Sequence, residues 1–110
     1  MKKIEAIIKP WKLGQVREEL GKIGILKIAS GEIQFSNSSV EDGDSMPMVE
    51  IKMVVADDRV SGVIDCIKSH AETGKNDGGE IQVTSVEQII PIRKPQTIET
   101  VPGGETAFHD

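Results

Sequence analysis

The feature of the sequence that most limits its fold is a repeated change of hydrophobic period, from alternating to helical and back. Residues 3–9 alternate between apolar and mostly charged positions, which predicts a half-buried strand that Pro10 ends. Residues 11–23 then carry apolar side chains at helical spacing, and Gly24 follows as a residue suited to the end of a helix. The chain therefore begins with a strand followed by a helix.

A hairpin is predicted next. Residues 26–35 favour a second strand, with a slip of phase at Gly31 that indicates a bulge or bend. Residues 49–55 alternate clearly and predict a third strand. The polar, acidic stretch 36–45 between them is typical of an exposed, flexible loop at the tip of the hairpin.

The last third repeats the helix and strand pattern. Asp57 is a suitable N-cap for a second helix, whose apolar stripe runs to Ala71. A glycine-rich turn over residues 73–79 leads to a short fourth strand that starts at Ile81. The resulting order, β-α-β-β-α-β, predicts a ferredoxin-like α+β fold with one antiparallel sheet and two helices on one of its faces.

Composition excludes several functions. The 110 residues fit one domain, which we place at residues 1–95 with a C-terminal tail over residues 96–110. Net charge is −5 and the basic residues are scattered, so nucleic-acid binding is not expected. No apolar run is long enough for a membrane span or a signal peptide, which predicts a cytoplasmic protein without direct membrane insertion. An apolar content of 37% indicates a thin core and favours a subunit that packs against copies of itself.

Residues with reactive or metal-binding side chains are few. Cys66 is the only cysteine, so neither an intrachain disulfide nor a thiolate cluster can form, and a buried, inert thiol is expected. His70 and His109 show no partner at the spacing of helical metal ligands and are expected on the surface. The acids in loop 36–45 do not match a calcium-binding loop. We therefore predict no metal site, no required cofactor and no enzyme activity.

Three stretches carry a resemblance to a known family. They are MKKIEAIIKPWKLGQVREELGKIGI, VEIKMVVADD, and TGKNDGGEIQV followed by VEQIIPIR. Together they cover residues 1–93 and resemble the PII nitrogen-regulatory signalling family. The resemblance implies a homotrimer with a cleft between each pair of subunits that binds ATP or ADP. It also implies that the loop after the second strand docks on a partner protein according to the ligand state.

The resemblance also implies which residues form the ligand site. Backbone N–H groups of a glycine-rich turn can approach and point at a phosphate. The nucleotide- or anion-binding residues implied in this sequence are Gly74, Lys75, Asn76, Asp77, Gly78, Gly79 and Arg93, with Ser38 and Ser39 of the loop. Two alternatives stay open, namely a turn that is only a glycine-rich connector and an Arg93 that is an ordinary surface residue.

Departures from the family pattern change the expected ligand. The loop is shorter than in the family, and the chain contains no tyrosine, which excludes control by uridylylation of a loop tyrosine. Met48 stands where the family has a lysine that pairs with 2-oxoglutarate, and loss of such a cation costs roughly 3–5 kcal/mol. Glu80 replaces a lysine of the phosphate turn, and Pro91 replaces one of two arginines. AMP, ADP or a small anion such as bicarbonate is therefore expected in preference to ATP.

The function that follows is a regulator whose loop switches with ligand binding and controls a target protein. Family branches with shortened loops are associated with bicarbonate uptake, carboxysome operons and metal efflux. A membrane transporter for inorganic carbon is accordingly our candidate partner, and a regulator linked to metal efflux is an alternative. The alternative from another class is a CutA-like trimeric structural or adaptor protein that binds no nucleotide.

Overall fold

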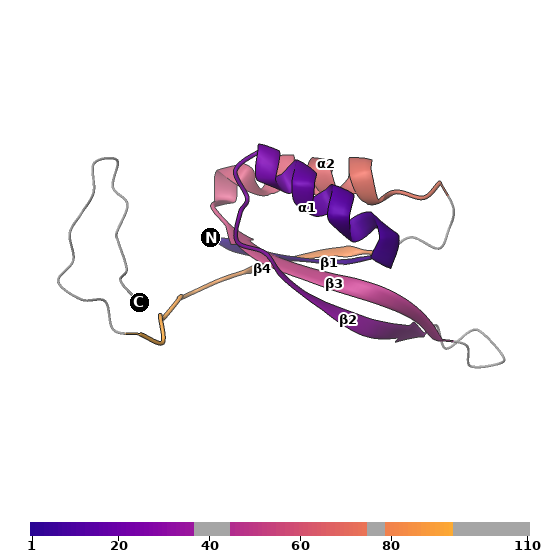
Figure 1. The fold of residues 1–110 in the computed structure, drawn as a ribbon. Coiled ribbons are helices and arrows are strands. Elements are labelled where there is room, and N and C mark those ends of the chain that lie inside the picture. The colour runs from indigo at the N-terminus through magenta and orange to yellow at the C-terminus, as the bar shows by residue number, and fades with distance from the viewer. Residues whose placement is uncertain (37–44, 75–78, 94–110) are drawn as a thin grey trace.

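A computed structural model describes residues 1–36, 45–74 and 79–93 of the chain. It confirms the predicted order of elements and the ferredoxin-like class (Figure 1). The strands are β1 (Lys2–Ile8), β2 (Ala29–Ser36), β3 (Ser45–Val55) and β4 (Ile81–Ser85). The α-helices are α1 (Leu13–Lys22) and α2 (Val60–Ala71), and each is preceded by a short 3-10 turn, η1 (Pro10–Lys12) or η2 (Asp57–Arg59).

The four strands form one sheet in the order β2-β3-β1-β4, and every neighbouring pair is antiparallel. Both helices cover the same face of this sheet, while the other face carries no helix (Figure 1). β1 lies in the middle, where Ile4 is opposite Met53 of β3 and Val83 of β4. The two segments that open and close the predicted pattern are therefore direct neighbours.

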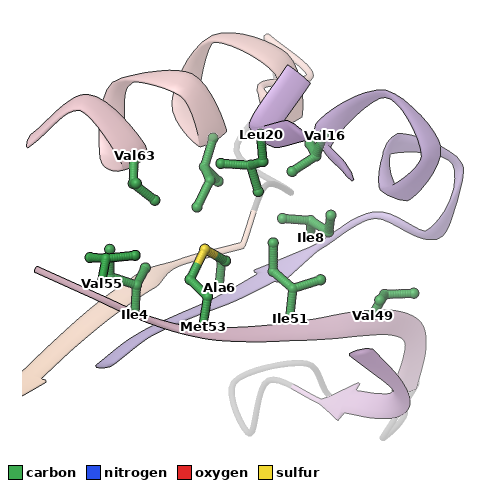
Figure 2. Packing of buried hydrophobic residues seen from close by; sticks show 11 residues of the cluster. Ile4, Ala6, Ile8, Val16, Leu20, Val49, Ile51, Met53, Val55 and Val63 are labelled. Carbon is green, nitrogen blue, oxygen red and sulfur yellow. The ribbon is translucent and has the colours of Figure 1, made fainter. Parts of the chain in front are cut away.

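The core lies between the sheet and the helices, and it follows from the two periods in the sequence (Figure 2). Alternate residues of β1 and β3 point to the helices, and the apolar stripes of α1 and α2 meet them. The buried apolar residues of this cluster are Ile4, Ala6, Ile8, Val16, Leu20, Val49, Ile51, Met53, Val55, Val63 and Ile67.

The second strand differs from its prediction. β2 starts only at Ala29, and residues 29–36 pair without interruption with residues 52–45 of β3, so the bulge expected at Gly31 is wrong. Leu26 precedes the strand and is 84% exposed. The apparent slip of phase arose because an apolar residue of the connecting segment was counted as part of the strand. Gly24, in contrast, has a φ of +89°, which confirms its place at the end of the helix.

The face of the sheet without helices is part apolar and part charged. Met48 and Ile33 lie opposite each other on this face, and Val54 lies further along β3 with 40% of its surface exposed. Glu5 and Glu50 lie on the same face, each in an ion pair on its own strand with Lys3 or Lys52. A mixed surface of this kind resembles the polar and apolar composition of subunit interfaces.

Asp57 has a role different from the predicted one. The N-cap position is occupied by Ala56 without a side-chain hydrogen bond, and the Asp57 carboxylate lies 2.9 Å from the Met1 ammonium group. The hydrogen bond and the charge of that ammonium group lower the pKa of Asp57. This ion pair joins the start of β1 to the turn before α2.

We expect Asp57→Asn to lower the melting temperature slightly near pH 7 and not at all near pH 2. Because the pKa of Asp57 is lowered in the folded chain, its stabilising effect is present above the unfolded value and is lost as the pH falls through the folded value. Both groups are more than half exposed, so the effect is small. Thermal unfolding of both proteins across this range tests the prediction, with Asp58→Asn as the control. A difference that persists near pH 2 would contradict it.

Candidate functional site

The glycine-rich turn begins at the end of α2. Glu72 N–H donates to the Lys68 carbonyl oxygen at 3.3 Å, and this bond closes the last turn of the helix. Gly74 then has a φ of +76°, a conformation that favours glycine because a Cβ atom would be strained there. The structure thus fixes where the turn starts and requires glycine at its second residue.

The other end of the turn is fixed by a close approach of two backbones. A Cβ atom at Gly79 would lie 1.4 Å from the Ile7 carbonyl oxygen. The next residue, Glu80, accepts a hydrogen bond from Ile7 N–H at 2.9 Å, just before β4 begins. Gly79 was predicted only as a phosphate contact, and its steric role was missed. A glycine directly before a strand is a signal for such an approach.

A groove lies beside this turn, between α2, the start of β4 and the end of β1. Its volume is about 560 Å³, within the range of small-molecule sites. Apolar side chains from the helix and from β4 form its walls, and polar groups lie at the end near the turn. The lining residues are Ile7, Ile8, Ile64, Ile67, Lys68, Ala71, Glu72, Thr73, Gly79, Glu80, Ile81 and Val83. Such a groove can accept an apolar ring and hold a polar group toward the turn.

Glu80 gives the end of the turn a negative charge. Its carboxylate accepts a hydrogen bond from Gln82 Nε2 at 2.6 Å. Glu5 and Glu50 lie with it around a small hollow on the face of the sheet without helices. Carboxylates at this position repel a highly charged phosphate group.

Arg93 does not lie near the turn of its own chain. β4 starts at the turn and runs antiparallel to β1, so it ends beside the N-terminus, where Val86 N–H donates to the Met1 carbonyl oxygen at 3.1 Å. Residues 86–93 then lead away from the sheet at that end (Figure 1). Within one chain, Gly79 and Arg93 are therefore on opposite sides of β4. A site that uses both needs two subunits.

Met48 is buried, with 1% of its surface exposed. It offers no positive charge at the position where the family resemblance implies a lysine. Lys9 is the only buried charged residue in the described part of the chain, and its ammonium group lies 3.5 Å from Met46 Sδ and 5.7 Å from the centre of the Trp11 ring.

Six of the predicted site residues lie outside the described residues, namely Ser38, Ser39, Lys75, Asn76, Asp77 and Gly78. The boundary predicted at residue 95 and the tail over 96–110 also lie outside them.

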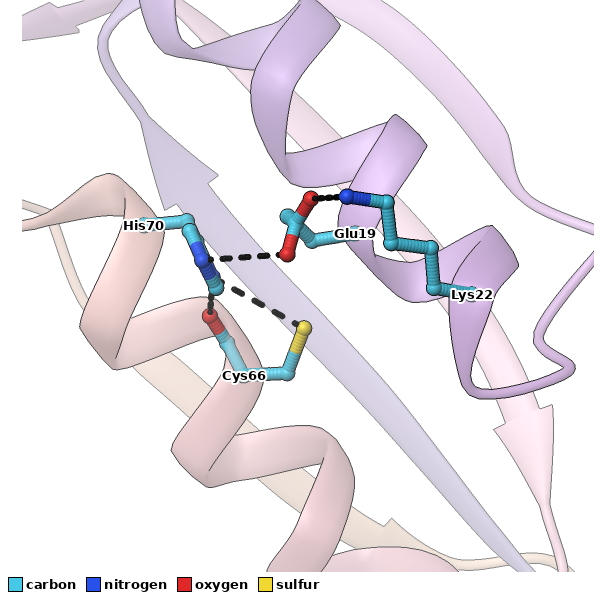
Figure 3. Close-up of polar contacts among 4 residues, drawn as sticks. All are labelled: Glu19, Lys22, Cys66 and His70. Carbon is cyan, nitrogen blue, oxygen red and sulfur yellow. Dashed lines mark hydrogen bonds and ion pairs between the residues drawn. The ribbon is translucent and has the colours of Figure 1, made fainter.

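A polar cluster that the sequence did not predict joins α1 to α2 (Figure 3). The surface position expected for His70 is wrong, because the ring is half-buried and lies 3.3 Å from a Glu19 carboxylate oxygen. Its Nδ1 atom is 3.9 Å from the Cys66 sulfur atom. Burial and the charge of Glu19 raise the pKa of the Cys66 thiol, which opposes a nucleophilic role. The i, i+4 spacing of Cys66 and His70 was the signal that could have indicated contact.

Two further properties concern only residues 1–36, 45–74 and 79–93. No group of three histidine, cysteine or acidic side chains in this part of the chain is placed to hold a metal ion. Neither of its α-helices is long and apolar enough to cross a membrane.

A four-stranded antiparallel sheet, two helices on one face and a glycine-rich turn into the last strand define a ferredoxin-like α+β domain. The sequence model of the family described as nitrogen regulatory protein P-II matches residues 1–96. The chain is 38% identical over 107 residues to the nitrogen regulatory protein P-II of Rhizobium meliloti, covering 88% of this chain and 96% of the relative. It is 41% identical over 103 residues to those of Pasteurella multocida and Klebsiella oxytoca, covering 84% of this chain and 92% of each relative. The chain belongs to the P-II family, and it is a signalling regulator rather than an enzyme.

Proposed function

We propose that this P-II protein is a homotrimer that binds AMP, ADP or a small anion such as bicarbonate in clefts between its subunits. Ligand binding orders the loop over residues 36–45, which includes Ser38 and Ser39, and so changes the affinity for a target protein. The target we propose is a membrane transporter for inorganic carbon, and the regulator itself is cytoplasmic. Control by 2-oxoglutarate is not part of this proposal, because buried Met48 carries no charge.

The observation that carries the proposal is the groove beside the glycine-rich turn. It is large enough for a nucleotide, and its apolar walls suit a base. Thr73 and Gly79 line the end from which the turn residues Gly74 to Gly78 extend, so phosphate groups would meet backbone N–H groups there.

The position of Arg93 supports a site made by two subunits. Its own chain holds it on the far side of β4 from the turn, so only the arginine of a neighbouring subunit can complete the phosphate contacts. The apolar and charged face of the sheet without helices offers a surface on which the subunits pack.

Glu80 supports a preference for less charged ligands. Its carboxylate lines the groove beside the turn, and Glu5 and Glu50 are close to it. Repulsion increases with each phosphate charge, so ATP is disfavoured relative to ADP and AMP.

Calorimetry with AMP, ADP, ATP, 2-oxoglutarate and bicarbonate tests the proposed function. We expect AMP or ADP to bind more tightly than ATP, and 2-oxoglutarate not to bind. Arg93→Ala should weaken nucleotide binding about 10- to 100-fold, because it removes a charge-assisted hydrogen bond. Arg17→Ala is the matched control, since this exposed arginine of α1 is bound to Ser30.

Two results would contradict the proposal. If no ligand binds below millimolar concentration, the trimeric adaptor without nucleotide becomes the better interpretation. If Arg93→Ala and Lys75→Ala both leave the affinity for nucleotide unchanged, the ligand lies elsewhere on the protein.

A further inference from the structure

His70 lies between two hydrogen-bond acceptors that belong to different helices. It occupies the last turn of α2, and its side chain is 27% exposed. Nδ1 is 2.8 Å from the carbonyl oxygen of Cys66, one turn earlier in α2. Nε2 is 3.3 Å from Oε1 of Glu19, on α1 (Figure 3).

Only one protonation state of the ring satisfies both contacts. A neutral imidazole has a proton on one nitrogen and a lone pair on the other. Either neutral form would therefore point a lone pair at an oxygen atom, at the Cys66 carbonyl or at the Glu19 carboxylate. The doubly protonated ring donates to both.

The charged groups around the ring favour this form on balance. From α1, Glu19 faces Nε2, while its other carboxylate oxygen accepts from Lys22 Nζ at 2.6 Å. The hydrogen bond from Lys22 and, to a lesser degree, the charge of His70 lower the pKa of Glu19, so this carboxyl is ionised when the imidazole titrates. From α2, Cys66 has a raised pKa and stays a neutral thiol, and Lys68 adds a positive charge.

The helix itself contributes in the same direction. The carbonyl groups at the end of a helix carry a partial negative charge, which favours a cation in the last turn. His70 is in that turn and accepts no hydrogen bond that would require its neutral form.

We propose that His70 is a proton-dependent clamp between α1 and α2. The protonated ring ties the last turn of α2 to Glu19, and loss of a proton breaks one of the two contacts. α2 ends one residue later, and Glu72 and Thr73 then lead into the glycine-rich turn. The clamp therefore holds the helix end from which that turn starts, whether or not the turn binds a ligand.

The direction of the pH effect follows from the proton count. Since the clamped fold holds a proton that the broken clamp releases, the clamp stabilises the folded chain at pH values where the ring is charged. This stabilisation is lost as the pH rises and the proton leaves. At much lower pH it is lost again, because Glu19 becomes protonated below its lowered pKa.

Thermal unfolding between about pH 5 and pH 9 tests the clamp with His70→Gln and Glu19→Gln. We expect His70→Gln to lower the melting temperature by about 4 °C near pH 6 and by less than half of that near pH 8.5. Glu19→Gln should remove the same pH dependence, because a glutamine amide can donate to a neutral ring. The double variant should lose no more than the larger single effect.

Two matched controls separate the clamp from general charge effects. Glu18→Gln removes a neighbouring carboxylate of α1, and His109→Gln removes the other histidine of the chain. Both should keep the pH dependence of the unchanged protein. A loss on His70→Gln that is the same at every pH would overturn the proposal and leave His70 a packing residue.

Nitrogen-15 NMR of the imidazole rings gives a second, independent measurement. We expect both nitrogens of His70 to carry protons near pH 6, and Glu19→Gln to favour the neutral ring at that pH. A neutral ring in the unchanged protein near pH 6 would also overturn the clamp, even if His70→Gln lowered stability.

Discussion

Gly79→Ala is expected to destabilise the folded chain by more than about 4 kcal/mol, a value seen only for severe local conflicts. The new Cβ atom would lie 1.4 Å from the Ile7 carbonyl oxygen, and this neighbour is backbone rather than a flexible side chain. To relieve the overlap, the start of β4 must move away from β1. That movement breaks the bond between Ile7 N–H and Glu80 and opens the edge of the sheet.

The measurement is chemical unfolding followed by circular dichroism. Gly62→Ala is the matched control, because Gly62 lies in α2 and a Cβ atom there meets nothing within 4 Å. This control should be neutral or stabilising by up to about 1 kcal/mol, since alanine favours a helix more than glycine does. Equal stability of Gly79→Ala and the unchanged protein would mean that β1 and β4 do not meet as the structure shows.

This prediction also separates two roles of the glycine-rich turn. If Gly79 served only to admit a phosphate, its replacement would weaken ligand binding and leave stability intact. The overlap with Ile7 instead places a structural requirement on the residue before any ligand is considered. Loss of binding in Gly79→Ala is therefore no test of the proposed ligand site, and Arg93→Ala serves that purpose better.

The fold was predictable because most elements carry a clear period. Alternation in β1 and β3 and the stripes of α1 and α2 identify the buried residues correctly. The start of β2 was not predictable in the same way, because Leu26 is apolar yet 84% exposed in a connecting segment. A single apolar residue next to a strand cannot be told from the first residue of that strand without the pairing partner.

The site was less predictable, because its parts depend on contacts between distant segments. The turn was visible as a cluster of glycines, but the approach of Gly79 to Ile7 depends on how β4 pairs with β1. The separation of Arg93 from the turn likewise follows from the direction of β4. The contact of His70 with Glu19 depends on how α2 lies against α1, which hydrophobic spacing alone does not give.

Leu20→Ala is expected to destabilise the folded chain by about 2–5 kcal/mol. Leu20 is fully buried in α1 and points to the sheet beside Val16 (Figure 2). Its replacement removes apolar contacts and leaves a cavity at the only place where α1 covers the core. In a small domain such a loss is a large part of the total stability.

Leu26→Ala makes the same chemical change at an 84% exposed position, so it should alter stability by less than about 0.5 kcal/mol. Both variants are compared by chemical unfolding at one pH. Leu20 does not line the groove beside the turn, so folded Leu20→Ala protein should bind nucleotide as the unchanged protein does. Equal stability of the two variants would show that α1 does not pack as described. Weaker binding by folded Leu20→Ala would instead show that the groove depends on the position of α1, as the contact between His70 and Glu19 also suggests.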